Sequence, residues 1–161
     1  MTNHVIRYAT ADDLPALGRL GASLMRVHYA LDRDRFMRPG DRAEEDYAAF
    51  LAAELENPDS LVLVAEQDGV VVGYIYAGIE PRSWKELRER AGFIHDVLVE
   101  EGRRSAGLAS ALIDGAIDWL RGRGVPRVLL WTAAPNTAAQ RLFERKGFRT
   151  TMLEMTTQLD A

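Results

Sequence analysis

Apolar and polar residues follow two different patterns along the chain, one typical of helices and one typical of strands. Between residues 14 and 27 the apolar positions recur every three or four residues, which predicts an amphipathic helix after an N-cap at Thr10. Residues 61–79 instead hold two β-rich runs around a turn at residues 67–69, which predicts an antiparallel hairpin. Both patterns occur again later in the chain, so the predicted fold class is α/β with a mixed sheet.

The predicted elements follow the order β-α-α-β-β-β-α-β-α-β. Strands are predicted at residues 5–9, 61–66, 70–79, 93–99 and 128–132, a last strand or hairpin at 148–159, and helices at 11–31, 43–55, 107–121 and 136–146. Strands joined by short turns must pair antiparallel, whereas the two strands that flank the third helix are far enough apart to pair in parallel. A length of 161 residues predicts one domain, residues 1–161.

Composition narrows the classes of function. The chain contains no cysteine, which excludes disulfide scaffolds, thiolate metal sites and covalent cysteine intermediates. Its three histidines form no metal-binding pair, so no metal is expected. The net charge of −4 disfavours a nucleic-acid partner. No signal peptide or bilayer-length apolar run is found, so we expect a cytoplasmic protein without a membrane partner.

Charge is distributed unevenly along the chain. Residues 1–101 hold 11 basic and 19 acidic residues, whereas residues 102–150 hold nine basic and three acidic ones. A small basic region inside an acidic chain indicates a compact polyanionic ligand, unless the surface charges are scattered by chance.

The stretch after the fourth predicted strand carries the candidate chemistry. It reads Arg104-Ser105-Ala106-Gly107-Leu108-Ala109 and leads directly into the third helix. Small residues there let a phosphate approach the backbone, where the N–H groups and the dipole of the helix would hold it. The alternative is an ordinary turn that needs glycine for its backbone angles. Neither a P-loop nor a dinucleotide fingerprint is present.

Two motifs resemble the GNAT family of N-acetyltransferases. Residues 104–109 (R-x-x-G-x-A) resemble its R/Q-x-x-G-x-G/A acyl-CoA signature, and residues 136–148 (N-x-x-A-x-x-L-F-x-x-x-G-F) resemble its N-x-x-A-x-x-L-Y-x-x-x-G-F segment. Because the order and spacing also fit, the resemblance covers essentially the whole chain. It implies a single GNAT domain whose parallel strands splay apart at the acyl-CoA site.

The resemblance implies transfer of an acetyl group from acetyl-CoA to a small amine, polyamine or basic peptide. With no cysteine, the amine must attack directly in a ternary complex. The residues implied to hold acetyl-CoA are Val97, Leu98, Val99, Arg104, Ser105, Ala106, Gly107, Leu108, Ala109, Ser110, Asn136 and Phe143. The pantetheine arm would pair with the strand like an added strand, and the backbone N–H of Val97 would stabilise the thioester oxygen. Dimers are frequent in this family, and the final strand could mediate a homodimer.

The general base departs from the family pattern. Many members carry Glu five residues before the motif's Asn and Tyr seven residues after it, but Trp131 and Phe143 stand at those positions. His95 is the candidate base, because it lies four residues before the strand end, as in the arylalkylamine N-acetyltransferases, and histidine titrates near neutral pH.

Other groups remain alternatives to His95. Regular strand alternation places His95, Val97 and Val99 on one face and Asp96 on the other, so Asp96 reaches the site only if a bulge shifts the strand. Glu100 and water are further candidates, and His95 itself could simply pack in the sheet. For the leaving thiolate, Tyr74, Tyr76 or solvent would supply the proton.

The acceptor pocket is expected near the end of the first helix and the loops. His28, Tyr29, Phe36 and Trp84 are its candidate residues, with packing in the core or in a lid as their alternative role. The competing function is a GNAT-like module that binds or senses acyl-CoA without turnover.

Overall fold

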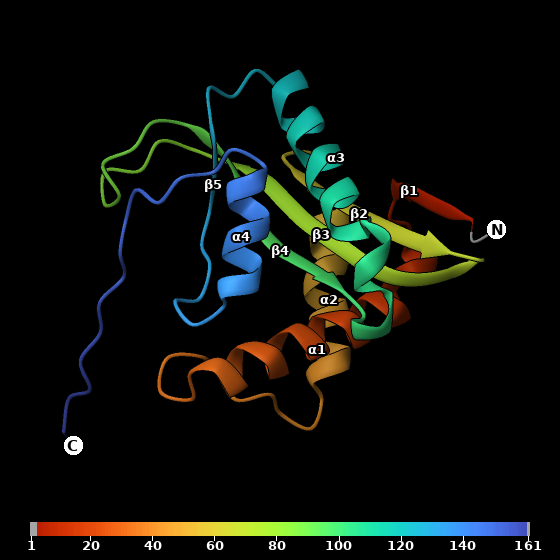
Figure 1. Ribbon diagram of the computed structural model, residues 1–161, viewed down its shortest axis with the longest axis horizontal. Helices are drawn as coiled ribbons and strands as arrows, with labels where there is room; N and C mark the ends of the chain where they lie inside the picture. Colours follow the sequence, from red (N-terminus) through yellow and green to blue (C-terminus); the bar gives the residue numbers. More distant parts are fainter. Residues whose placement is uncertain (1–2, 161) are drawn as a thin grey trace.

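Five strands form one mixed sheet whose spatial order follows the chain (Figure 1). The computed structural model describes residues 3–160, apart from the side chains of residues 104–106. The strands are β1 (His4–Tyr8), β2 (Ser60–Gln67), β3 (Val70–Glu80), β4 (Ala91–Val99) and β5 (Val128–Leu130). Strands β1 to β4 pair antiparallel, and β5 pairs parallel to β4 across a helical crossover.

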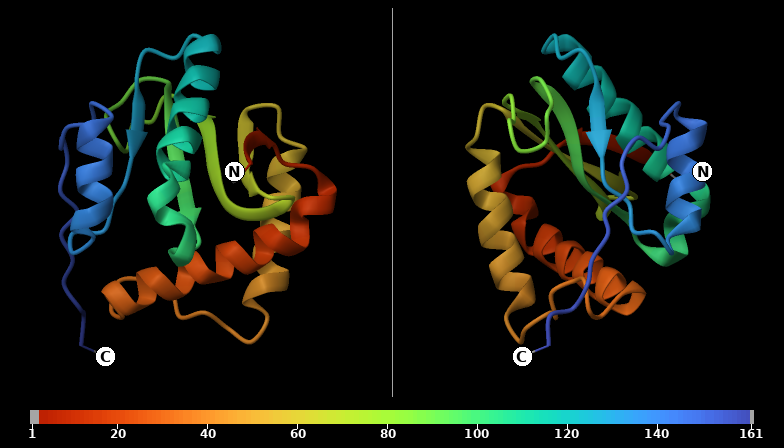
Figure 2. Two further views of the ribbon diagram at one scale, coloured as in Figure 1. Left: turned by 45° about the vertical axis from the view of Figure 1, so that its right-hand side comes forward. Right: turned by 90° about the vertical axis from the view of Figure 1, so that its left-hand side faces the viewer.

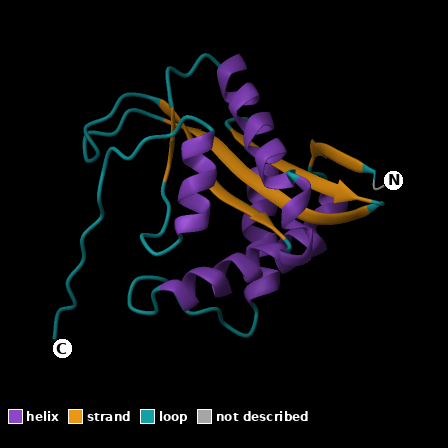
Figure 3. Ribbon diagram, in the orientation of Figure 1, coloured by secondary structure: helices purple, strands orange, loops and turns teal. Residues whose placement is uncertain are grey.

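Helices cover both faces of this sheet (Figures 2 and 3). One face carries α1 (Leu14–Leu31) and α2 (Ala43–Leu55), and the other carries α3 (Leu108–Gly122) and α4 (Thr137–Arg145). We call these the α1/α2 face and the α3/α4 face.

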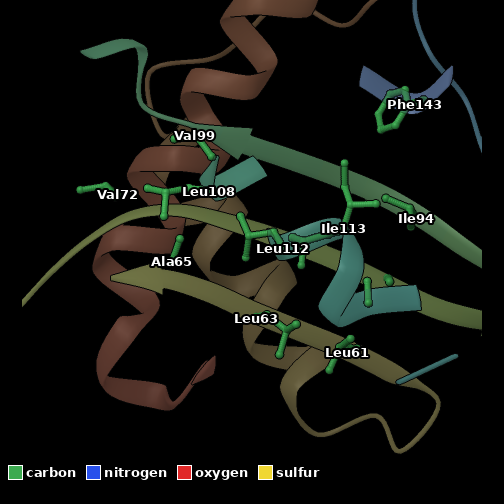
Figure 4. Packing of buried hydrophobic residues seen from close by; sticks show 13 residues of the cluster. Leu61, Leu63, Ala65, Val72, Ile94, Val99, Leu108, Leu112, Ile113 and Phe143 are labelled. Atoms are coloured by element: carbon green, nitrogen blue, oxygen red, sulfur yellow. The ribbon is translucent and has the colours of Figure 1, made fainter. Parts of the chain in front are cut away.

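A cluster of buried apolar side chains lies beneath each pair of helices. On the α3/α4 face, Leu63 and Ile94 of the sheet pack with Leu112 of α3 (Figure 4). On the α1/α2 face, Val64 packs in one cluster with Leu17 of α1. Removal of this apolar surface from water is the main force that holds the two layers of helices on the sheet.

A β-bulge interrupts β4 at His95. Tyr76 of β3 pairs with Asp96, and the next residue, Ala77, pairs with Ile94, so His95 is the extra residue of the bulge. An extra residue in one strand reverses which side chains beyond it face each side of the sheet.

The predicted fold class is confirmed, including the splayed parallel strands. β5 is shorter than predicted, because its pairing with β4 ends where Ile94 meets Leu130. Residues of the predicted loop before the third helix form a short 3-10 helix, η2 (Glu101–Ala106).

The strand predicted over residues 148–159 is wrong for the described structure. Within the part of the chain that is described, residues 149–160 are extended and exposed but belong to no strand. A strand needs a hydrogen-bonding partner edge, and none of the described strands lies against this segment.

Candidate functional site

The sheet opens between β4 and β5 beyond Ile94. β5 stops at Leu130, while β4 continues to Val99. The Glu100 N–H donates to the Val72 carbonyl on β3 (2.8 Å), and backbone groups alternate in direction along a strand. The backbone N–H of Val97 therefore faces the opening, where a ligand could pair with it as an added strand.

The loop that follows leads to the N-terminus of α3. Gly107 is the N-cap, and its positive φ of 73° is a left-handed conformation that favours glycine. A Cβ at this position would meet no atom of the described residues within 4 Å, so among these residues there is space for a ligand beside the backbone. The side chains of Arg104, Ser105 and Ala106, which were predicted to contact the cofactor, lie outside the described residues. Arg103, by contrast, donates to the side chain of Gln67 (2.7 Å).

Two residues implied to contact acetyl-CoA have structural partners. The Asn136 side chain accepts a hydrogen bond from the Ala139 N–H (3.2 Å) and so caps α4. Phe143 is only 7% exposed and packs against Phe148 in the cluster of the α3/α4 face. A contact between either residue and acetyl-CoA stays a prediction.

The bulge changes the expected faces of β4. The rings of Tyr76 and Phe93 stack on His95 at centroid distances of 4.8 and 5.2 Å, whereas Val97 packs into the cluster of the α3/α4 face. His95 and Val97 therefore lie on opposite faces, and the prediction that they share one is wrong. The extra residue is the cause, and it brings His95 and Asp96 onto the same α1/α2 face.

His95 has an acidic partner on the neighbouring strand. Its Nε2 lies 3.1 Å from Oε1 of Glu80, the last residue of β3. The His95 side chain is 28% exposed, so it combines a fixed orientation with access from solvent. A carboxylate that accepts from one ring nitrogen leaves the other free to take a proton.

A row of six rings crosses the α1/α2 face through His95. Neighbouring centroids are 4.8–5.7 Å apart. In spatial order the rings belong to Tyr47, Phe50, Tyr76, His95, Phe93 and Trp131, and we call this row the aromatic strip. The strip is open to solvent at Phe50, which is 44% exposed, and at its Trp131 end, which is 73% exposed.

Asp96 is partly buried beside the strip, and two phenols hold it. Its Oδ2 accepts hydrogen bonds from Tyr74 (2.9 Å) and from Tyr47 of α2. Tyr47 fits there because α1 has glycine opposite: a Cβ at Gly21 would lie 1.9 Å from the ring. Burial raises the pKa of Asp96, and burial together with this carboxylate raises the pKa of both phenols. The phenols therefore stay protonated near neutral pH and act as hydrogen-bond donors.

The predicted acceptor residues are dispersed. His28 and Phe36, at the end of α1 and in the next loop, meet edge to face at 4.9 Å. His28 is near enough to Asp96 for its charge to favour the ionised carboxylate. Tyr29 lies under the guanidinium of Arg33, and Trp84 is 79% exposed in the loop between β3 and β4.

A cleft of about 520 Å³ gives access to the open part of β4 from α1. Its lining includes Arg19 and Ser23 of α1 and Leu98 and Glu100 at the end of the strand. Glu100, one alternative base, pairs with Arg19 (3.4 Å). Glu80, and not Glu100, is the carboxylate that contacts His95. The sequence pattern did not reveal this contact, because the contact depends on the pairing of β3 with β4.

Family comparison agrees with this geometry. The profile of the acetyltransferase (GNAT) family matches residues 25–148, and the chain belongs to this family. A mycothiol acetyltransferase of Acidimicrobium ferrooxidans is 32% identical over 111 residues, which are 67% of this chain and 34% of that protein. The N-acetyltransferase YhfO of Bacillus subtilis is 31% identical over 100 residues, 62% of this chain and 66% of that protein. The chain thus spans about a third of the first relative's length.

Solved structures share the fold. A Bacillus halodurans protein superimposes with a TM-score of 0.82 at 20% identity, over 96% of this chain and 99% of that chain. An aminoglycoside N-acetyltransferase in complex with CoA gives 0.77 at 18% identity, over 100% of this chain and 97% of that one.

Two kinds of feature are absent from the described residues. No group of three or more His, Asp or Glu side chains there could hold a metal ion. None of the described helices has the length and apolar character needed to cross a membrane.

Proposed function

We propose that this chain is a single-domain N-acetyltransferase of the cytoplasm that moves an acetyl group from acetyl-CoA to an amine in a ternary complex. The observation that carries the proposal is the bulge in β4. It presents the His95–Glu80 pair on the α1/α2 face two residues before Val97, whose N–H faces the open edge of the same strand.

Several features fit acetyl-CoA, which supplies the activated acetyl group. The opening beside Val97, Leu98 and Val99 suits the pantetheine arm, and the space beside Gly107 suits a phosphate at the N-terminus of α3. The amides of residues 105–110 and the Arg104 side chain would hold the pyrophosphate. The Val97 N–H would donate to the oxygen on which charge develops.

His95 is proposed as the general base. An amine is protonated at neutral pH and must lose a proton before it can attack. With Glu80 accepting from Nε2–H, Nδ1 of His95 carries the lone pair that takes this proton. The carboxylate then stabilises the imidazolium that forms. Burial next to carboxylates raises the pKa of Tyr47, Tyr74 and Tyr76 and makes these phenols weaker acids. Solvent therefore supplies the proton for the leaving thiolate.

The aromatic strip supports a cationic acceptor. Ring faces attract ammonium groups, and two carboxylates, Glu80 at His95 and Glu54 near Tyr76, flank the strip. A small amine, a polyamine or a basic peptide would satisfy this chemistry. The exposed end at Trp131 leaves room for an acceptor longer than the strip's buried centre.

A non-catalytic acyl-CoA-binding module is the second candidate. The observation that favours it is the placement of Trp131 and Phe143: one is an exposed ring and the other a core ring, and neither can transfer a proton. In that case His95 would only pack between Tyr76 and Phe93.

Thiol release separates the two candidates. Because the chain contains no cysteine, a thiol reagent added to the reaction reports only free CoA. We expect release from acetyl-CoA with at least one member of a panel of monoamines, polyamines and basic peptides. In parallel, CoA should raise the melting temperature. Stabilisation by CoA with no thiol release from any acceptor would favour the binding module.

A further inference from the structure

The peptide group that joins Asp96 to Val97 carries the N–H proposed to stabilise the thioester oxygen. Among the described strands, none pairs with its outer side, because the pairing of β4 with β5 ends at Ile94. On its inner side the register with β3 shifts at the bulge, directly before Asp96. A strand bends and twists where a bulge interrupts the ladder. Backbone pairing alone therefore fixes the direction of this N–H only weakly.

The Asp96 side chain adds an anchor from two directions. Its Oδ2 accepts one hydrogen bond from Tyr74 of β3 (2.9 Å) and one from Tyr47 of α2. Tyr74 is fully buried, and Tyr47 packs against the same cluster on the α1/α2 face. Close packing prevents either ring from moving far. Two donors from different elements that meet at one oxygen thus fix both the position and the direction of the carboxylate.

Stability of the fold does not explain this anchor. Within the described residues, Asp96 has no arginine or lysine partner, whereas Asp13 pairs with Arg7. Removal of a carboxylate and two hydroxyls from water costs free energy that apolar side chains of similar size would not cost. In addition, α1 has glycine at position 21, where a Cβ would collide with the Tyr47 ring at 1.9 Å. The cluster therefore fits a role that packed apolar side chains cannot fill.

We propose that Tyr47, Tyr74 and Asp96 form a brace that points the N–H of Val97 at the thioester oxygen, so that Asp96 is a positioning residue for acetyl transfer. The inference rests on the proposed function, since that reaction gives the N–H its task. The brace acts through the peptide group that Asp96 shares with Val97. A donor stabilises the developing charge only when it is aimed at it, and a misplacement of about 1 Å costs on the order of a hundredfold in rate.

His95 is held separately from the brace. Its ring stacks on those of Tyr76 and Phe93. Its Nε2 contacts Glu80. Loss of the brace should therefore misdirect the N–H of Val97 while the histidine keeps its place.

Removal of single hydroxyls tests the brace without removing the packed rings. We expect Tyr47→Phe and Tyr74→Phe each to lower kcat about three- to tenfold, the equivalent of one neutral hydrogen bond. Asp96→Ala should lower kcat about 10–100-fold, with the KM for acetyl-CoA nearly unchanged. Tyr8→Phe, at a residue of β1 that is 64% exposed, is the matched control and should keep the wild-type kcat. The phenylalanine variants decide the question if Asp96→Ala does not fold.

The conservative substitution separates a positioning role from a role of the charge. Asp96→Asn should recover most of the rate, because its amide oxygen accepts from both phenols as Oδ2 does. An Asp96→Asn enzyme as slow as Asp96→Ala would mean that the charge itself acts on the substrate, and it would overturn the proposal. Wild-type kcat in both phenylalanine variants would overturn it as well.

The Val97 amide gives a readout that needs no turnover. The probe is the analogue of acetyl-CoA in which a methylene group replaces the thioester sulfur. By NMR, we expect it to shift the Val97 amide proton downfield in the wild type and in Asp96→Asn, and markedly less in the phenylalanine variants. Equal shifts in all variants would refute the brace, even if thiol release is normal. A wild type that releases no CoA with any acceptor would instead refute the acetyl transfer, and the amide shift would still test the brace.

Discussion

The two faces of the sheet differ in what they bury. Under α3 and α4 the buried side chains are apolar, and β3 and β4 contribute to that face residues such as Ile75 and Ile94. Under α1 and α2 the same two strands contribute Tyr74, Asp96 and His95. Burial of polar groups costs free energy unless each finds a partner. The α3/α4 face thus mainly stabilises the fold. The α1/α2 face carries the free-energy cost of its polar groups, and it is the face on which the catalytic histidine is proposed.

The bulge is the local cause of this difference. Up to Ile94, the side chains of β4 alternate regularly between the two faces, and the strand pairs with both β3 and β5. From His95 onward it no longer pairs with β5, and the alternation is shifted by one residue. Two consecutive polar side chains then face α1 and α2, which a regular strand cannot achieve.

Substitution of His95 should produce the largest effect, and it should lower activity without lowering stability. We expect His95→Ala to lower kcat/KM for the amine by about 10²–10⁴-fold, the usual contribution of a positioned general base. The melting temperature should change little, because the ring is partly exposed. Thiol release measured from about pH 6 to about pH 9 checks this, since the deficit should shrink as the amine loses its own proton.

The exposed His4 of β1 provides the matched control, and His4→Ala should keep wild-type activity. A His95→Ala enzyme with full rate across that pH range would refute the base assignment.

A substitution in the opposite face should change stability instead. Leu112 of α3 is fully buried, so Leu112→Ala is expected to lower the free energy of unfolding by about 2–5 kcal/mol. The rate per folded molecule should stay the same. Urea unfolding followed by circular dichroism measures the first effect. Met37→Ala, at a position 75% exposed, should change stability by less than about 0.5 kcal/mol. A large fall in kcat for Leu112→Ala at full folding would contradict the division between the faces.

Substitution of Glu80 tests whether His95 depends on its carboxylate partner for catalysis. We expect Glu80→Gln to reduce kcat about tenfold, the equivalent of one charge-assisted hydrogen bond of ~1.5 kcal/mol. The KM for acetyl-CoA should not move, because Glu80 is placed on the acceptor side. Glu80→Asp should recover part of the rate, and Glu89→Gln, which removes the partner of Arg82 in an exposed loop, should have no effect. Equal losses in both glutamine variants would exclude a positioning role for Glu80.

Local patterns predicted most of the fold because they depend on neighbouring residues. The helix after the R-x-x-G-x-A motif and the hairpin turn at Asp68-Gly69 occur where expected, since capping and turn formation need only a few adjacent residues. The arrangement of side chains on the α1/α2 face could not be predicted from neighbouring residues alone. Placing His95 on the face of Asp96, or beside Glu80, requires the register of two strands, and one extra residue alters it without any trace in composition. A strand or hairpin was predicted over residues 148–159, but local sequence does not say which edge such a strand would join, and the described structure has no strand there.

The smallest effect concerns the partly buried carboxylate of Asp96. Burial raises the pKa of Asp96 above its value in the unfolded chain, so its contribution to stability is fully present only at acidic pH and is lost as the pH rises through the folded-state pKa. At pH values above this folded-state pKa, the ionised Asp96 therefore costs stability. We expect Asp96→Asn to be more stable than the wild type there, because the amide carries no charge that burial disfavours. This advantage should fade toward about pH 4, which urea titrations at several pH values would measure.

Asp13 supplies a control of opposite sign. Arg7 donates two hydrogen bonds to it (2.8 and 2.9 Å) and lowers its pKa, so its stabilising effect is present at neutral pH and lost on acidification. Asp13→Asn should therefore be less stable than the wild type at neutral pH, and the difference should narrow as the pH falls. If the two asparagine variants showed the same trend with pH, Asp96 would be an ordinary paired carboxylate. The α1/α2 face would then bury its polar groups at no cost.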